Sequence, residues 1–466
     1  MNVASQKQTV AVIGGGLSGL AAACALSGAG FGVTLFERKP FLGGRASSYE
    51  HPGTGEVVDN CQHVLLGCCT NLIDFYRRIG VEQQIRWYER LTFIEPGGRR
   101  GQLAPSWLPA PFHSSFAFLR FPLLSIADKA AVTRALLTLM AGIPPDSDKD
   151  FLTWLRQTGQ TQRAIDRFWA PVLVSALNDD LDHVSVRYGA MVFRDAFLKS
   201  AAAGRMGVPT VPLSELYGVA ADYIRARGGE VLLRCPVEGF DQQPERVMVR
   251  TENSQRAFDF VIPAVPFQAL SRLLPRSSAS ERLTGELAGL KTVPITGIHL
   301  WFDREITPLD HAVLLDRTIQ WMFQKSKILG RSSPGNGSYL ELVVSSSKTL
   351  LDKNRSELIE LALRELAEFF PSVREATLLK ATVVKEVHAT FSPGPGSDRY
   401  RLKPQTEWPR VFLSGDWTDT GWPATMEGAV RGGYRTAEEV AKAAGKVQRF
   451  QVADLESQGL MRVFPA

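Results

Sequence analysis

The sequence has few cysteines, no long hydrophobic run and no block of like charges. Its cysteines number five and include no CxxC pair: Cys24, Cys61, Cys68, Cys69 and Cys235. We therefore expect neither a disulfide framework nor a metal site, and a reducing cytoplasm fits this composition best. No uninterrupted apolar run reaches the ~18 residues that a membrane span requires, and we expect no signal peptide.

Charge is nearly balanced, with 53 Lys and Arg against 48 Asp and Glu and a formal net charge of +5. No basic run or aromatic-interleaved basic patch is present in the sequence, so nucleic acid is not an expected partner. A weak attraction to anionic lipid stays open. The 466 residues, 44% of them hydrophobic, suffice for a large core and two or more domains.

The strongest signal present is a glycine-rich turn between an apolar strand and an alanine-rich helix, at Gly14, Gly16 and Gly19. The first glycine permits a tight turn, the second lets a pyrophosphate approach the backbone, and the third lets the helix pack closely on the sheet. At Leu17 and Ser18 the new helix presents free N–H groups to phosphates. The alternative is a glycine-rich turn without a ligand.

A second apolar strand, residues 32–36, ends in Glu37 and is followed by Arg38. The carboxylate of Glu37 can accept hydrogen bonds from ribose hydroxyls. Strand, turn, helix, strand and acid thus follow in the order that predicts dinucleotide binding.

Two later segments favour FAD over NAD. Gly43, Gly44 and Arg45 indicate a second close backbone approach to the pyrophosphate or ribityl chain, with Arg45 adding positive charge. Near the C-terminus a short apolar strand ends in Gly415 and Asp416, and Asp416 is placed to accept a ribityl hydroxyl. The alternatives are an ordinary loop with a surface arginine and an aspartate that caps a helix or turn.

A helix beginning near Thr425 would aim its positive end at the flavin pyrimidine, where negative charge accumulates on reduction. The segment that leads into it supplies the remaining expected contacts: Pro423, Ala424, Thr425 and Met426.

These motifs together resemble the FAD-dependent flavoproteins of the amine oxidase and phytoene desaturase type, over about residues 8–445. The stretch from Asp59 to Cys68, with Gln62 and His63 inside it, is similar to hydroxysqualene dehydroxylases, although Cys61 stands where that family has glycine. The resemblance implies that the backbone of Val237 contacts the adenine.

The resemblance also implies an α/β fold: a Rossmann-like FAD-binding domain (GR2-type) with an inserted α+β substrate domain and a helical cap. We assign the discontinuous FAD-binding domain to residues 8–85, 205–270 and 405–445. Residues 86–204 should form a mostly helical cap or membrane-facing part, and residues 271–404 the substrate-binding part. Apolar periodicity predicts helices at 128–140, 151–156 and 355–369, and strands at 296–302, 339–345 and 381–387.

The reaction that the resemblance implies is reductive dehydroxylation of hydroxysqualene to squalene, in squalene or hopanoid biosynthesis. The allylic alcohol would ionise after protonation, and reduced flavin would supply hydride. The general acid must reach the hydroxyl and be protonated at working pH, which burial among apolar groups favours. The candidates are Gln62 and His63, beside the flavin loops, and Asp195, among aromatics. Ordinary alternatives are a core histidine and an Asp195 paired with Arg194 or Arg187.

Other functions stay open. A carotenoid-type desaturase would use the same scaffold on a long isoprenoid lipid but would abstract hydride. An amine oxidase would need a small polar pocket, yet Trp417 and Trp422 stand where a tyrosine-rich cage is usual. A non-catalytic, FAD-stabilised lipid carrier is a further alternative. No second nucleotide motif identifies the electron donor, so a separate reductase and NAD(P)H are both open.

Residues 103–126 combine many large apolar side chains with four prolines, which exclude one long helix. The segment is either a membrane-dipping patch that guards a lipid tunnel or part of the core of the cap. The expected location is therefore the cytoplasm, with peripheral contact at the inner membrane left open. Residues 460–464 are apolar apart from one arginine and have no assigned role.

Overall fold

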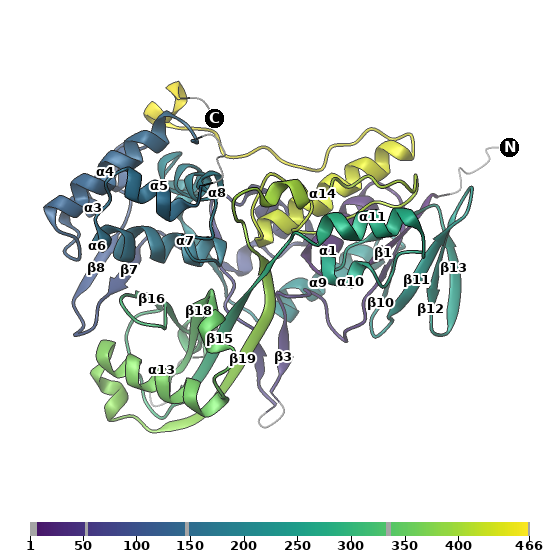
Figure 1. Ribbon diagram of the computed structural model, residues 1–466. Helices are drawn as coiled ribbons and strands as arrows, with labels where there is room; N and C mark the ends of the chain where they lie inside the picture. Colours follow the sequence, from purple (N-terminus) through teal and green to yellow (C-terminus); the bar gives the residue numbers. More distant parts are fainter. Residues whose placement is uncertain (1–6, 52–54, 145–148, 332–336, 465–466) are drawn as a thin grey trace.

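The computed structural model describes residues 7–51, 55–144, 149–331 and 337–464 (Figure 1). A parallel sheet forms the centre of the part that the sequence predicts to bind a nucleotide, called the nucleotide-binding part below, with its strands in the order β10-β2-β1-β14. Its strands are short and apolar because both faces of the sheet are covered, one by helices and the other mainly by the strands of residues 237–258. They are β1 (Thr9–Ile13), β2 (Gly32–Phe36), β10 (Glu230–Leu232) and β14 (Phe260–Pro263).

Four helices pack on one side of this sheet: α1 (Leu17–Gly28), α2 (Thr70–Ile79), α9 (Leu213–Arg225) and α14 (Met426–Ala443). Helix α14 packs closely against α1, although about 400 residues of chain separate them. A Cβ atom on Gly433 would overlap the carbonyl oxygen of Ser18, so this close approach requires glycine. The C-terminal part of the chain thereby completes the nucleotide-binding part, as Figure 1 shows.

A second, mixed sheet has seven strands in the order β19-β15-β18-β17-β16-β7-β8. Helix α13 (Arg355–Phe369) packs against it. The helix expected at 355–369 and the strand expected at 339–345 are confirmed. The strands expected at 296–302 and 381–387 are also confirmed, and each is several residues longer than expected. The strands are β7 (Leu91–Ile94), β8 (Arg100–Leu103), β15 (Thr292–Phe302), β16 (His311–Leu314), β17 (Trp321–Gln324), β18 (Tyr339–Ser345) and β19 (Leu378–Phe391).

Strands β7 and β8 differ from the expectation of a mostly helical segment beginning at residue 86. Gly97 and Gly98 both have positive φ and turn the chain into a hairpin. Phe93 of this hairpin pairs with Val313 of β16, so residues 91–103 complete the seven-stranded sheet. Smaller sheets are formed by β3 (Ser48–Glu50), β4 (Val57–Asp59), β5 (Leu65–Leu66), β6 (Ile85–Tyr88), β9 (Met206–Pro209), β11 (Val237–Gln242), β12 (Val247–Thr251) and β13 (Ser254–Phe258).

The remaining large part is helical and has its own buried core. Ser125 caps α4 and forms a reciprocal capping box with Asp128. Two π-helical turns, Ile165–Trp169 and Phe193–Leu198, interrupt the helices. The helices are α3 (Ser115–Arg120), α4 (Ile126–Ala141), α5 (Phe151–Gln157), α6 (Gln162–Ala164), α7 (Ala170–Leu177) and α8 (Val186–Val192).

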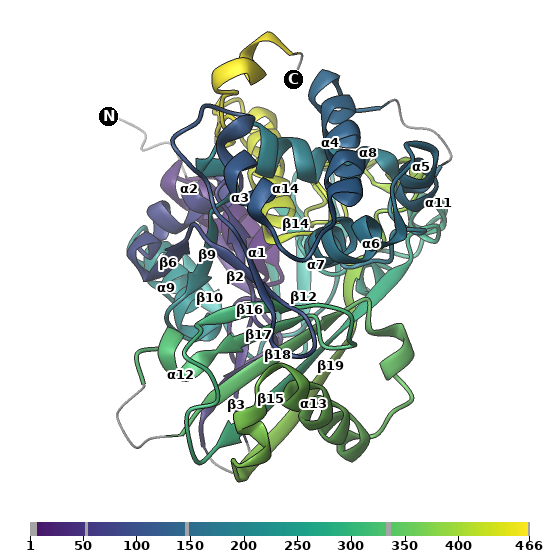
Figure 2. The same ribbon diagram turned by 90° about the vertical axis from the view of Figure 1, so that its left-hand side faces the viewer.

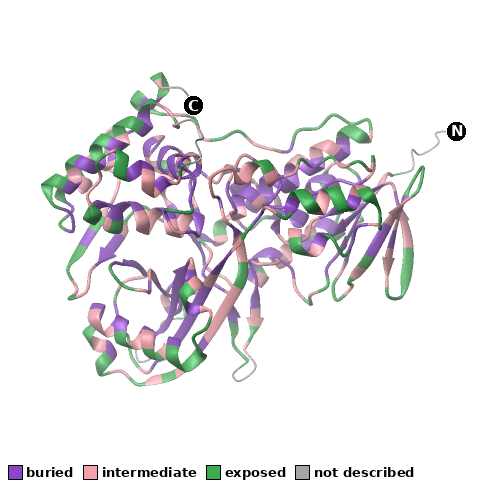
Figure 3. Cartoon of the chain, viewed as in Figure 1, coloured by how far each residue is buried: buried purple, intermediate pink, exposed green. Residues whose placement is uncertain are grey.

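The C-terminal residues return to this helical part. A 3-10 turn, Gly459–Val463, lies at the same end of the molecule as α3 and α4 (Figure 2). Figure 3 shows that buried residues concentrate where the parts meet and along the two large sheets. Two cavities between the parts, described below, lie among these elements.

Candidate active site

The glycine turn and the acid that follows the second strand meet in the structure. The amide of Gly14, at a φ of 113°, donates to Phe36 O over 2.8 Å. Glu37 is buried and accepts hydrogen bonds of 2.7 Å from the amides of Gly15 and Lys39, while its neighbour Arg38 is exposed. The carboxylate is thus fixed beside the turn, at the start of helix α1.

Packing within the protein requires glycine at two of the three positions of the turn but not at the third. A Cβ on Gly14 would lie 2.5 Å from Ala264 O, and one on Gly19 would overlap Gly14 O. A Cβ on Gly16 would meet nothing nearer than Gly44 Cα, at 3.9 Å. Internal packing therefore does not demand glycine at position 16, whereas close approach of a pyrophosphate does. The turn fits a dinucleotide.

The second glycine pair and the C-terminal acid converge on this turn. Gly43 donates to Gly15 O over 2.8 Å, which places residues 43–45 against the first loop. Arg45 forms an ion pair of 2.6 Å with Asp416, whose carboxylate is nearly buried. Residues that the sequence assigned to two different FAD contacts therefore lie side by side.

Two further contacts tie the outer segments to the same region. Ser18 and Ser414 share a hydrogen bond of 2.7 Å between their hydroxyls, next to Gly415. The amide of Cys235 donates to Glu37 O over 2.9 Å, which brings the chain that enters β11 at Val237 toward the acid.

Helix α14 begins at Met426, and Thr425 caps it by accepting a 3.0 Å hydrogen bond from the amide of Gly428. Its positive end is preceded by the buried Pro423 and Ala424. The expected helix start near Thr425 is therefore confirmed.

Glu427 lies in the first turn of α14 and was not singled out in the sequence. Its carboxylate accepts hydrogen bonds from the amide of Leu72, at 2.7 Å, and from Arg431 Nε, at 2.6 Å. Burial raises the pKa of Glu427, and Arg431 opposes that shift. The residue links α2 to α14 and contributes to the wall of the cavity below.

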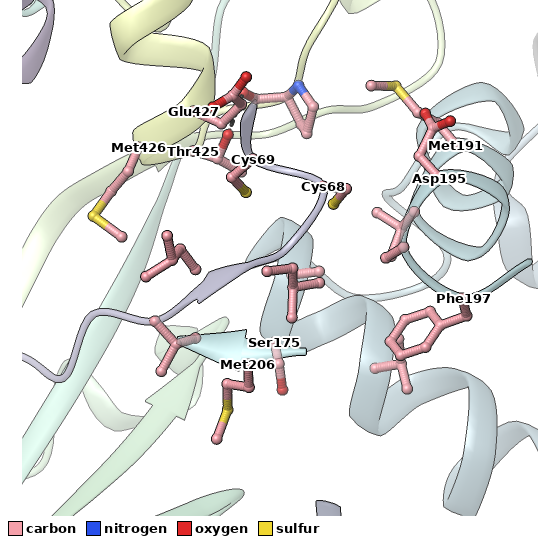
Figure 4. A pocket seen from close by; sticks show the side chains of 18 of the residues that line it. Cys68, Cys69, Ser175, Met191, Asp195, Phe197, Met206, Thr425, Met426 and Glu427 are labelled. Carbon is pink, nitrogen blue, oxygen red and sulfur yellow. Dashed lines mark hydrogen bonds between the residues drawn. The ribbon is translucent and has the colours of Figure 1, made fainter. Parts of the chain in front are cut away.

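An apolar cavity of about 1080 Å³, partly open to solvent, adjoins the N-terminus of α14. Figure 4 shows Thr425 and Met426 on one side of it, Asp195 on the other and Cys68 between them. Polar lining groups are few, and most of the wall is aliphatic or aromatic, as in many binding sites for apolar ligands. The lining residues include Val64, Leu65, Leu66, Leu91, Phe93, Val172, Ser175, Met191, Phe197, Met206, Val313, Trp321 and Trp422.

Asp195 lines this cavity, as one of the candidate acids must. Burial raises the pKa of Asp195 above its usual range, and Lys199, 3.4 Å away, opposes the shift. The expected pairing with Arg194 or Arg187 is wrong. Arg194 donates to the carbonyl groups of Leu139 and Met140 at the end of α4, and Arg187 pairs with Asp398, whereas Asp195 lines the cavity.

Gln62 and His63 are placed differently from Asp195. Among the described residues, the cavity wall includes Val64 but neither Gln62 nor His63. The ring Nδ1 of His63 lies 2.8 Å from Cys61 O, and burial lowers the pKa of His63. Gln62 turns its amide oxygen toward Lys325 Nζ, at 2.8 Å. The structure therefore does not bring either side chain together with Asp195.

Gln62 instead belongs to a buried ionic cluster. Lys325 Nζ donates to Asp59 Oδ2 over 2.8 Å and lies 3.6 Å from Glu341 Oε2. Burial opposes the charge on each group, but Lys325 holds the pKa of Asp59 below its usual range. Burial raises the pKa of Glu341 to about 8. The cluster fixes the loop that carries Val64 into the cavity.

The sequence did contain a signal for this cluster. Glu341 stands in the apolar strand Tyr339–Ser345, both faces of which are buried. An acid at such a position must find a partner, and Lys325 directly follows another apolar strand. What the sequence could not give is the proximity of Lys325 to Glu341, which depends on the pairing of β17 with β18.

A cluster of potential cation ligands lies elsewhere in the chain. In the described part of the chain, Asp179, Asp180 and His183 come close enough to hold a cation, but Lys348 Nζ already contacts all three. Within the same residues, no helix combines the length and apolar character needed to cross a bilayer.

Comparison with known proteins identifies the family of this chain. Residues 17–441 match the family described as flavin containing amine oxidoreductase. The chain belongs to this family. FAD is therefore its cofactor, in agreement with the fit of the glycine turn, and the protein is a flavin-dependent oxidoreductase.

Within this amine oxidoreductase family, similar curated proteins are carotenoid desaturases. The chloroplastic/chromoplastic zeta-carotene desaturase of Zea mays is 29% identical, over 94% of this chain and 84% of its own. The 15-cis-phytoene desaturase of Synechococcus elongatus is 26% identical, over 94% and 97%.

Solved structures agree on the fold. An oxidoreductase from Methanosarcina mazei has a TM-score of 0.71 at 18% identity, covering 91% of this chain and 99% of its own. A putrescine oxidase triple mutant has a TM-score of 0.72 at 18% identity, covering 94% and 99%. The expected α/β flavoprotein fold is thus confirmed.

Proposed function

We propose that the protein is an FAD-dependent desaturase of a long isoprenoid lipid, of the carotenoid type. The observation that carries this proposal is the apolar cavity beside the N-terminus of α14. The similarity to carotenoid desaturases along nearly the whole chain supports the same reaction. A cavity with this wall favours a hydrocarbon over a polar amine.

FAD, when bound, supplies the two-electron hydride acceptor or donor for this chemistry. In our proposal the pyrophosphate lies against Gly16 and the start of α1, and the ribose hydroxyls face Glu37. Arg45 and Asp416 would supply charge and hydrogen bonds to the phosphate and ribityl groups. The other proposed contacts are Gly14, Leu17, Ser18, Gly19, Arg38, Gly43, Gly44, Val237, Gly415, Pro423, Ala424, Thr425 and Met426.

The side chains of the cavity would perform the remaining tasks. Desaturation removes a hydride from one carbon atom and a proton from the neighbouring carbon atom. The hydride would pass to FAD. The apolar wall would orient the chain and exclude water, and the carboxylate of Asp195 would accept the proton. Its raised pKa makes it a stronger base than an ordinary carboxylate.

One observation favours a second candidate, reductive dehydroxylation of hydroxysqualene. A pure hydrocarbon offers Asp195 no hydrogen-bond partner, whereas an allylic hydroxyl would. With its raised pKa, Asp195 could protonate that hydroxyl, water would leave, and the allylic cation would receive hydride. Both candidates use the same cavity and the same carboxyl group in opposite protonation states.

Anaerobic single turnover tests the proposal. We would mix oxidised holoenzyme with phytoene or zeta-carotene, and photoreduced holoenzyme with hydroxysqualene, following the flavin absorbance and the lipid products together. Bleaching of the oxidised enzyme with formation of a longer polyene supports desaturation. Return of oxidised flavin with squalene would establish dehydroxylation instead. A flavin silent toward every one of these lipids would refute both.

The variant Asp195→Asn links the chemistry to this cavity. It should slow the productive reaction by about 10²–10⁴-fold, as loss of a general acid or base does, while flavin content stays unchanged. Asp182→Asn, which alters an exposed carboxyl, is the matched control and should behave like the unaltered protein.

A further inference from the structure

Large exposed hydrophobic side chains gather at one end of the helical part. Trp107 is 84% exposed, Leu119 65% and Ile126 87%, and Phe116 packs its ring against Trp107. Monomeric soluble proteins seldom expose such groups together unless something covers them. With two residues of the C-terminal turn, Leu460 and Val463, these side chains form a surface that we call the apolar rim.

The C-terminal turn is held in place beside the segment that carries Trp107. The amide of Leu460 donates to Ala110 O over 2.9 Å, and that of Gln458 donates to Lys199 O over 3.0 Å. Met461 is buried in the core of the helical part, so Leu460 and Val463 stay on its surface. Figure 2 shows this turn, α3 and α4 at the same end of the molecule.

The exposed charges beside the proline-rich segment and α4 are positive, while the C-terminal turn is flanked by Glu456 and Arg462. Between residues 103 and 143 the cations are Arg120, Lys129 and Arg134. The acid in this stretch is Asp128, which is buried and engaged in capping α4. Apolar side chains flanked by exposed cations complement a bilayer that contains anionic lipid.

A second cavity, of about 1200 Å³ and partly open to solvent, lies directly beneath the rim. Phe112 and Leu137 line it and are themselves exposed, so it reaches the surface between the proline-rich segment and α4. Its inner wall shares residues with the cavity beside α14: Leu91, Phe93, Val172, Ala196 and Phe197. The two cavities therefore adjoin across a shared wall, one on the side of the rim and the other on the side of the proposed flavin site.

We propose that the apolar rim docks on an anionic lipid bilayer, with the second cavity as the path between the bilayer and the inner cavity. The docking rests on the rim and its charges alone. The path for substrate rests in addition on the proposed function, because it requires a lipid substrate.

Vesicle co-sedimentation of the holoenzyme tests the docking without any turnover. We would compare vesicles of phosphatidylcholine alone with vesicles that also contain phosphatidylglycerol. The variant Trp107→Ser/Leu119→Ser/Ile126→Ser changes side chains that line neither described cavity. It should lower the partition coefficient by at least about tenfold, because interfacial binding scales with the apolar area buried.

The matched control is Leu379→Ser/Val387→Ser/Val447→Ser, which removes exposed apolar side chains far from the rim in sequence. It should bind vesicles like the unaltered protein. A second variant, Arg120→Gln/Arg134→Gln, should weaken binding to the anionic vesicles by about fivefold per charge and leave binding to neutral vesicles unchanged.

Three outcomes would overturn the proposal. Equal sedimentation of the rim variant and the unaltered protein would refute docking through this surface, and so would equal binding of the charge variant to anionic vesicles. If analytical ultracentrifugation showed a dimer that the rim variant loses, while vesicle binding did not change, the rim would be an interface between copies. Vesicle binding that persists in a protein inactive on every lipid would refute the function but leave the docking intact.

Discussion

The buried cluster of Asp59, Lys325 and Glu341 leads to a definite prediction about stability and pH. All three side chains are at most 3% exposed, and one ammonium group faces two carboxyl groups. Lys325 holds the pKa of Asp59 low, whereas burial raises the pKa of Glu341 to about 8. At neutral pH, Glu341 is therefore mainly protonated and the cluster carries no net charge.

The sign of the effect follows from proton linkage. Below pH 4.5, the ordinary pKa of a glutamate, Glu341 is protonated in both the folded and the unfolded chain. Between there and pH 8 the unfolded chain releases the proton while the folded chain keeps it. Over this window the contribution of Glu341 to the free energy of unfolding falls by about 1.4 kcal/mol per pH unit. The full decrease is about 5 kcal/mol.

The variant Glu341→Gln removes the titration while preserving the size of the side chain. It should lie close to the unaltered protein in stability near pH 5 and exceed it increasingly toward pH 8, by up to about 5 kcal/mol. The assay is guanidinium unfolding followed by tryptophan fluorescence at several pH values, at one fixed FAD concentration. Glu375→Gln, at an exposed carboxyl, should run parallel to the unaltered protein. If Glu341→Gln also ran parallel, the cluster would not titrate as argued.

Three further predictions test other parts of the structure. Lys325→Met should lower the free energy of unfolding by about 3–5 kcal/mol in the guanidinium titration, because it leaves Asp59 buried without its cation. The control Lys327→Met, at a partly exposed lysine, should lower it by less than about 1 kcal/mol. Gly16→Val should remove FAD while the far-UV circular dichroism stays native, and a yellow protein would contradict the assigned pyrophosphate site. Asp416→Ala should weaken FAD binding by about 10–100-fold in a fluorescence titration, the loss expected for hydrogen bonds to a charged group, and Asp419→Ala should not.

Local patterns sufficed for much of the fold. The order of strand, glycine turn, helix and acid identified the start of the nucleotide-binding part, because these features follow one another closely in the sequence. Apolar periodicity predicted a helix at 128–140, and the structure shows α4 there, beginning two residues earlier after its cap Ser125. The hairpin at residues 91–103 was missed, because its pairing partner β16 lies more than 200 residues later.

The candidate site was less accessible to sequence reasoning. The sequence suggested Arg194 or Arg187 as the partner of Asp195, yet Arg194 bonds to a carbonyl group at the end of α4 and Lys199 is the partner. Residues four apart on a helix are neighbours, so the spacing of Asp195 and Lys199 was a signal that the sequence reasoning missed. Gln62 was expected at the flavin face but bonds to a lysine 263 positions later.

Asp195 is the point at which the two candidate reactions diverge, and pH distinguishes them. As the base in desaturation it must be ionised, so the rate should rise as pH increases through its raised pKa. As the acid in dehydroxylation it must be protonated, so the rate should fall over the same interval. The slope of the single-turnover rate against pH therefore reports the role of this carboxyl group independently of the product analysis. A slope that Asp195→Asn leaves unchanged would show that another group, with Glu427 the next candidate in the cavity wall, moves the proton.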